Sequence, residues 1–157
     1  MWLHYTDVEL TKFRTLDISD LKDKYLFKPV GLWLSYNDEW MEWCANAEFY
    51  TSNIDTHHIY EVDLNNIFKD SINLIKITNI EEFEIFTKKY AHFSKEFRSQ
   101  KIDWYQVMQD YDGLMVLNYY QIKHSIKLNM MNTWFFALDI SCACIWNGTK
   151  VTFKELL

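Results

Sequence analysis

Short apolar and alternating runs recur along the chain, and polar stretches of similar length separate them. Runs of this length that are rich in Val, Ile, Tyr, Phe and Trp favour β-strands over helices. Seven segments fit this description: 1–6, 31–35, 56–64, 72–77, 114–119, 142–146 and 149–153. A further apolar run covers 134–139 and is read as a strand that ends at Asp139, whereas 120–132 shows no regular pattern and is expected to be irregular.

Helical periodicity is clearest over 80–90. This segment follows Thr78 and Glu81, which have the spacing of a capping box. Its apolar residues recur at the spacing of one helix face, at Ile80, Phe83, Phe86 and Tyr90. The pattern predicts a helix packed on a core, and no chemistry is assigned to it.

Shorter helices are expected elsewhere. One begins near Glu39, after the capping candidates at 37–38. Another covers 104–111 and is capped by Asp103. Scattered apolar positions in the first half of 7–28 predict a short helix followed by a polar loop.

The tally of about seven strands and three or four helices, not strictly alternating, predicts an α+β fold. A length of 157 residues fits a single domain over 1–157 with a sizeable core. The Asn147-Gly148 pair stands between two β-prone runs and is the strongest short hairpin signal. We therefore expect 142–146 and 149–153 to pair.

The overall composition restricts the location and the partners. Aromatic residues reach 18% and apolar residues 49%, which excludes a disordered chain. The formal net charge of −6, without a long basic run, disfavours a general nucleic-acid surface but leaves a local basic groove open. Three cysteines are too few for a disulfide framework. With neither a signal peptide nor an apolar run of membrane-spanning length, we expect a cytoplasmic protein without membrane contact.

Several common chemistries lack their motifs. There is no GxGxxG and no GxxxxGK[ST] sequence, so the usual phosphate-cradling loops are missing. Cys142 and Cys144 without a second pair are a weak zinc signal, and no metal site is predicted. Ser141 is not surrounded by GxSxG, and Cys44 ends a predicted helix instead of beginning one, so neither is a favoured nucleophile.

The stretch GLWLSYNDEWMEWC, residues 31–44, carries the most suggestive arrangement. A strand that runs directly into a helix makes a corner, with Trp33 on one side and Trp43 on the other. Two indoles that face each other across a corner form a slot for a flat ring. The alternative is that both indoles simply belong to the core.

With His4-Tyr5-Thr6 in the first strand, this stretch resembles the histidine–tyrosine–glutamate ADP-ribosyltransferases, the enzymes of diphtheria-toxin and poly(ADP-ribose) polymerase type. The resemblance implies that His4 holds a ribose hydroxyl of NAD. It also implies that the Tyr5 backbone and the Thr6 hydroxyl hold the nicotinamide amide. Trp33 and Trp43 would then sandwich the nicotinamide ring. The remaining cofactor-binding residues implied by the second motif are Gly31 and Ser35.

The sequence departs from the family pattern in three places. Tyr5 replaces a glycine, tryptophans replace tyrosines, and the glutamate of the final motif has no counterpart. The nearest acid is Asp139, and some toxin-like branches of the family use aspartate. The expected catalytic residues are therefore His4 and Asp139. Tyr111-Asp-Gly113, which leads into a strand, is similar to the family's second half.

The resemblance implies a compact fold of twisted, mainly antiparallel sheets with short flanking helices. The implied activity is transfer of ADP-ribose from NAD to a macromolecular acceptor, with release of nicotinamide. A protein inhibitor or antitoxin, and nucleic acid, are open as partners. The alternative is a non-enzymatic module that binds a protein through exposed aromatics. A third reading is stacking on single-stranded nucleic acid, with the phosphates held by Lys95, Arg98, Lys123 and Lys127.

Overall fold

The structure is a computed structural model that describes residues 1–17, 28–47, 58–64, 72–95, 99–126 and 133–156. Its main sheet has seven strands in the order β4-β7-β8-β2-β1-β3-β9. These strands are β1 (Trp2–Thr6), β2 (Leu32–Tyr36), β3 (His58–Asp63), β4 (Leu74–Ile77), β7 (Gly113–Val116), β8 (Cys142–Ile145) and β9 (Thr152–Glu155). All neighbours are antiparallel except the parallel pair β4–β7, so the sheet is mixed but mainly antiparallel.

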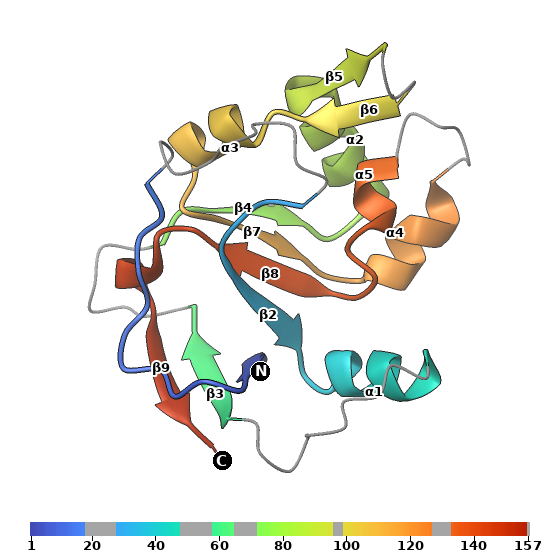
Figure 1. The fold of residues 1–157 in the computed structure, drawn as a ribbon. Helices are drawn as coiled ribbons and strands as arrows, with labels where there is room; N and C mark the ends of the chain where they lie inside the picture. Colours follow the sequence, from blue (N-terminus) through green and yellow to red (C-terminus); the bar gives the residue numbers. More distant parts are fainter. Residues whose placement is uncertain (18–27, 48–57, 65–71, 96–98, 127–132, 157) are drawn as a thin grey trace.

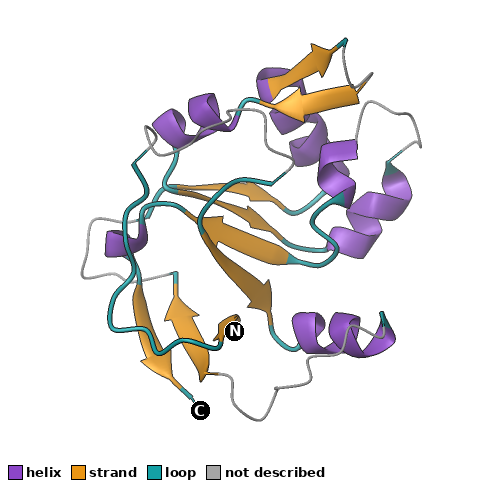
Figure 2. Cartoon of the chain, viewed as in Figure 1, coloured by secondary structure: helices purple, strands orange, loops and turns teal. Residues whose placement is uncertain are grey.

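Helices and one small hairpin cover this sheet, which confirms the α+β prediction (Figures 1 and 2). The helical elements are α1 (Glu39–Asn46), α2 (Ile80–Tyr90), α3 (Trp104–Asp110), α4 (Tyr119–Ser125), α5 (Thr133–Phe136) and η4 (Gly148–Lys150). The hairpin consists of β5 (Ala91–Ser94) and β6 (Ser99–Ile102). In Figure 1, α2, α3, α5 and the hairpin lie on one side of β4, β7 and β8, while α1 follows the end of β2.

The sheet is buried on both faces along β7 and β8. Leu114 and Cys144 face the aromatic cluster under α2, α3 and α5, whereas Met115 and Ala143 face a second, smaller cluster. This alternation follows from the two-residue period of a strand. All four residues of each strand are buried, which explains why 114–116 and 142–145 contain only apolar side chains and cysteine.

The predicted capping box is wrong by one residue. Asn79, not Thr78, is the N-cap of α2, and its side chain accepts a hydrogen bond from the Glu82 N–H at 2.9 Å. The Glu82 carboxylate reaches back to the Thr78 N–H at 2.6 Å and to the Thr78 hydroxyl at 2.8 Å. The reciprocal bonding of a capping box is therefore present, displaced by one position along the chain.

Three other predictions were wrong at the level of elements. Residues 119–125 form α4, whereas 120–132 was expected to be irregular; 127–132 lie outside the described residues. The run 134–139 starts within α5 and not in a strand. No helix occurs in 7–17, and the rest of the predicted helix-and-loop segment up to 27 lies outside the described residues.

The Asn147-Gly148 hairpin is also wrong, because β8 and β9 are not neighbours in the sheet. The segment before residue 17 occupies the place where a hairpin partner would lie: Thr15 bridges to Asn147, and the Gly148 N–H donates to the Arg14 carbonyl. A Cβ on Gly148 would lie 2.5 Å from that carbonyl oxygen. The glycine is therefore needed for close approach, and the chain turns away through η4 to pair β9 with β3.

The main sheet opens between β1 and β2. Their pairing consists of Trp2 with Tyr36 and Leu3 with Ser35, and then it ends. β1 continues along β3 as far as Thr6, while β2 continues along β8. The two strands therefore separate in the middle of a continuous sheet, which exposes backbone and side-chain groups that a closed ladder would cover.

Candidate functional site

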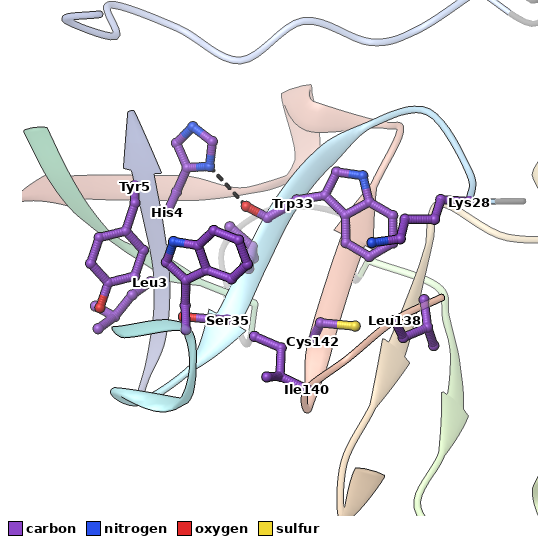
Figure 3. A pocket seen from close by; sticks show the side chains of 11 residues that line it. Leu3, His4, Tyr5, Lys28, Trp33, Ser35, Leu138, Ile140 and Cys142 are labelled. Carbon is purple, nitrogen blue, oxygen red and sulfur yellow. Dashed lines mark hydrogen bonds between the residues drawn. The ribbon is translucent and has the colours of Figure 1, made fainter. Parts of the chain in front are cut away.

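A cavity of about 360 Å³ lies where β1 and β2 separate. Its walls come from β1, from the segment that runs from Lys28 through β2 to Trp40, and from 138–142 (Figure 3). The volume falls within the usual range for small-molecule sites, about 300–1,000 Å³. Segments far apart in the sequence thus build one pocket.

His4 bridges the opening. Its Nδ1 lies 2.8 Å from the backbone oxygen of Trp33, and because a carbonyl only accepts, Nδ1–H is the donor. Burial lowers the pKa of His4 below its ordinary 6.5, although the hydrogen bond to Trp33 opposes this shift. The ring is therefore neutral at pH 7, and its Nε2 is left as a hydrogen-bond acceptor.

Tyr5 presents its backbone to the same opening. In an antiparallel ladder, successive residues direct their N–H and C=O groups to opposite sides. Asn37 donates to the Met1 carbonyl and Leu3 pairs with Ser35, so the odd residues of β1 face β2. Tyr5 is the next odd residue of β1 and lies beyond Leu3 and Ser35, the last pair between β1 and β2. Its N–H and C=O are consequently directed at the opening and not at β3.

Trp33 and Trp40 supply the aromatic walls of the pocket. Trp43 does not line it; its ring instead stacks on Trp40, with centroids 5.3 Å apart and planes 12° from parallel. The expected corner between β2 and α1 is present, but the α1 indole that lines the pocket together with Trp33 belongs to Trp40. The neighbouring Trp43 supports it from behind, on the same helix.

The structure places the other expected binding residues differently. Ser35 lines the pocket and donates its hydroxyl to the Asn37 carbonyl at 3.3 Å. The Thr6 hydroxyl accepts the Val8 N–H at 3.2 Å and is outside the lining. Gly31 is outside it as well, and a Cβ there would lie 2.7 Å from both the Cys144 Sγ and the Ile145 oxygen. Close packing of β2 on β8 therefore accounts for this glycine.

Asp139 stands at the edge of the site, between the lining residues Leu138 and Ile140. Its φ of 69° is unusual for a residue other than glycine. Its carboxylate lies 3.6 Å from the Nζ of Lys28, which does line the pocket. Lys28 also lies over the Trp33 ring, 5.8 Å from its centroid.

The floor of the pocket is apolar. Leu138, Ile140 and Cys142 line it from the segment that leads into β8. Burial raises the pKa of Cys142 to about 12, so this thiol stays protonated and inert at neutral pH. Within the described residues, no group of three or more His, Cys, Asp or Glu side chains could hold a metal ion.

Sequence reasoning missed Trp40, Lys28 and the floor residues. Trp40 lies in the same helix as Trp43, and only the rotation of α1 decides which of the two faces the pocket. Lys28 gave no signal, because it belongs to no motif. The floor came from a run that had been read as a strand.

Comparison with protein families, with characterised proteins and with solved structures gave no match for this chain. In the described part of the chain, no helix is both long and apolar enough to cross a membrane. The functional argument therefore depends on the geometry of the pocket.

Proposed function

We propose that the pocket between β1 and β2 binds the nicotinamide end of NAD and that the domain transfers ADP-ribose to a macromolecular acceptor. The observation that carries the proposal is the hydrogen bond from His4 to the Trp33 carbonyl, which fixes a neutral imidazole beside an aromatic pocket. Nε2 can then accept a ribose hydroxyl. The outward-facing N–H and C=O of Tyr5 match the two complementary groups of a carboxamide.

The remaining walls suit a flat, uncharged leaving group. Trp33 and Trp40 in the lining could stack on a pyridine ring, and the floor of Leu138, Ile140 and Cys142 is apolar. Stacking combined with amide contacts would hold nicotinamide in one orientation. The glycosidic bond to the ribose would then be fixed beside His4.

In the proposed reaction the bond between the nicotinamide nitrogen and the ribose C1′ breaks. Nicotinamide leaves with the electron pair, positive charge develops on the ribose, and a nucleophile of the acceptor forms the new bond to C1′ and loses its proton. A carboxylate beside the ribose would stabilise this charge in the transition state. Asp139 lies between the lining residues Leu138 and Ile140, and its carboxylate contacts Lys28 of the pocket wall, so it is our candidate for this role.

One observation supports a second function, a binding module without transferase activity. No carboxylate is among the described residues that line the pocket, and the charge of Asp139 is paired with Lys28. Such a domain would hold NAD or another flat ligand without cleaving it. The two functions differ in turnover, not in binding.

The reaction would take place in a reducing compartment, in keeping with a cytoplasmic protein. Cys44, Cys142 and Cys144 are all buried free thiols.

The decisive experiment is a titration with NAD and with nicotinamide, followed by intrinsic fluorescence. Trp33→Phe and His4→Ala should each weaken binding while the folded circular dichroism spectrum is retained. A folded His4→Ala protein with unchanged NAD affinity would contradict the proposed site. Incubation with labelled NAD and a lysate, followed by protease or nuclease, would then identify the class of acceptor.

Single-turnover transfer separates the enzyme from the binding module. Asp139→Asn should lower the rate about a hundredfold, equivalent to about 3 kcal/mol, with little change in NAD affinity. An unchanged rate would remove Asp139 from catalysis. If the wild-type protein binds NAD but transfers nothing to any acceptor class, the binding module is the better description.

A further inference from the structure

The pocket has one permanently charged side chain among its described lining residues, that of Lys28. His4 is neutral at pH 7, and the remaining walls are aromatic, aliphatic, hydroxyl or thiol groups. In Figure 3 the Lys28 side chain extends across the rim, with its amine beside the Trp33 ring and opposite the floor residue Leu138. A charge at the rim of a largely apolar pocket is suited to an anionic substituent of the ligand, beyond the ring that the walls hold.

The two contacts of Lys28 with described residues are easily exchanged. The Nζ lies 3.6 Å from the Asp139 carboxylate, and the side chains are 46% and 37% exposed. Ion pairs this exposed contribute little to stability. The second contact, over the Trp33 ring at 5.8 Å, is near the outer limit for a cation–π interaction. Neither contact would hold the ammonium against a stronger anion.

We propose that Lys28 recognises the phosphate of a ring-bearing nucleotide in this pocket and leaves Asp139 to do so. This inference rests on the proposed function and adds the group that distinguishes a nucleotide from its nucleoside. A lysine ammonium binds phosphate as a point charge, and its flexible stem can move from the carboxylate to a nearby phosphate. A phosphate is the strongest anion that a nicotinamide nucleotide can present at the rim.

The exchange has a consequence for the acid. While Lys28 pairs with Asp139, it offsets the negative charge that would stabilise a developing ribosyl cation. When a phosphate takes the ammonium, that carboxylate is released. The carboxylate of Asp139 is therefore unpaired only when a phosphorylated ligand is bound to Lys28. Asp139 and the phosphate compete for the ammonium of Lys28.

The test uses two ligands that differ by a single phosphate, nicotinamide riboside and nicotinamide mononucleotide. The quantity measured is the ratio of their dissociation constants by calorimetry. In the wild-type protein the mononucleotide should bind about tenfold more tightly, the gain of one charge-assisted contact. Lys28→Met should reduce this ratio to near one. Lys28→Arg should keep most of the ratio.

Two further variants serve as controls. Lys89→Met removes another exposed lysine that pairs with an aspartate, Asp110 at 3.2 Å, away from the pocket lining. It should leave the ratio at the wild-type value. Asp139→Asn removes the competitor, so it should raise the ratio about twofold to threefold.

The outcomes separate this inference from the proposed function. Suppose that the riboside binds, and that either Lys28→Met keeps the wild-type ratio or the wild-type ratio is one. Lys28 then does not recognise phosphate, and the proposed nicotinamide site is retained. If neither ligand binds the wild-type protein, both the inference and the proposed site are overturned. A ratio that falls equally in Lys28→Met and Lys89→Met would show a general charge effect and would also overturn the role of Lys28.

Discussion

Two tryptophan clusters in this molecule contain the same residue type and differ in almost everything else. Trp104 and Trp134, each 1% exposed, pack with phenylalanines beneath α2, in a cluster that we call the core cluster. Trp33, Trp40 and Trp43 are only partly buried, and we call them the pocket cluster. Trp33 and Trp40 line the cavity where β1 and β2 separate, and Trp43 stacks on Trp40. Both meet the same large apolar core.

The difference lies in what each cluster encloses. Rings of the core cluster are in contact on every side, and the Trp134 Nε1–H donates to the buried Thr87 hydroxyl at 3.2 Å. The pocket cluster stands where two strands separate, and the indoles of Trp33 and Trp40 line the cavity there. The number of aromatic residues therefore does not distinguish the two clusters. The candidate binding site arises because the backbone pairing of β1 and β2 ends beside the pocket cluster.

The largest expected effect is on the core cluster. Trp134→Ala should lower the free energy of unfolding by about 3–5 kcal/mol, because it removes a fully enclosed ring and leaves the Thr87 hydroxyl unpaired. Trp33→Ala should cost less than about 2 kcal/mol, since that side chain is only partly buried. Urea denaturation of both variants measures the contrast, and equal losses would remove the distinction between the clusters.

The next effect concerns the strand that carries Trp33. Gly31→Ala should destabilise the protein by about 1–3 kcal/mol, because the new methyl group meets the Ile145 backbone oxygen at 2.7 Å, which cannot rotate away. Thermal unfolding reports this loss. Gly31→Ala should leave NAD affinity in the folded protein nearly unchanged, and a selective loss of binding would instead give Gly31 a direct role in the site.

A smaller effect separates the two stacked indoles of α1. Trp40→Phe should weaken nicotinamide binding by roughly 0.5–1.5 kcal/mol, because Trp40 lines the pocket and a smaller ring covers less of the ligand. Trp43→Phe is the matched control from the same stack and should change affinity less than about twofold. A larger loss of nicotinamide affinity in Trp43→Phe than in Trp40→Phe would instead support the sandwich of Trp33 and Trp43 that was expected from the sequence.

The smallest effect is a pH dependence. Because burial places the pKa of His4 below 6.5, NAD affinity should be constant from pH 8 down to that value and then decline as Nε2 gains a proton. Stability should decline in the same direction, since between the two pKa values the unfolded chain binds more protons than the folded one. His4→Gln keeps an acceptor without titrating, so a decline that is identical in His4→Gln would not arise from His4.

Local signals predicted much of this fold. The periodicity of 80–90 and the cap at Asp103 are confirmed by α2 and by α3, where Asp103 accepts the Gln106 N–H at 3.2 Å. The strands expected near 1–6, 31–35 and 142–146 are also present. These elements depend on neighbours in the sequence, which is the range over which patterning is informative.

The failures arose where distant segments decide the outcome. Asn147-Gly148 has hairpin composition, yet contacts with Arg14 and Thr15 direct the chain elsewhere. The corner between β2 and α1 was foreseeable, but the choice of Trp40 as the wall residue depends on how α1 packs against the core. The opening of the sheet left no trace in the sequence, because it is an absence of pairing between two ordinary strands.

The order of strands in the sheet also determines when each pair of strands can form during translation. The neighbours β1 and β3 both lie within the first 63 residues, whereas β2 cannot pair with β8 until Ile145, the partner of Leu32, has been made. Contacts this distant form slowly, because a long loop must close before any pairing offsets its entropy. The floor of the pocket is completed with Cys142. A nascent chain would therefore lack the floor of the pocket until β8 has left the ribosome, and the complete pocket would form only after most of the chain has been translated.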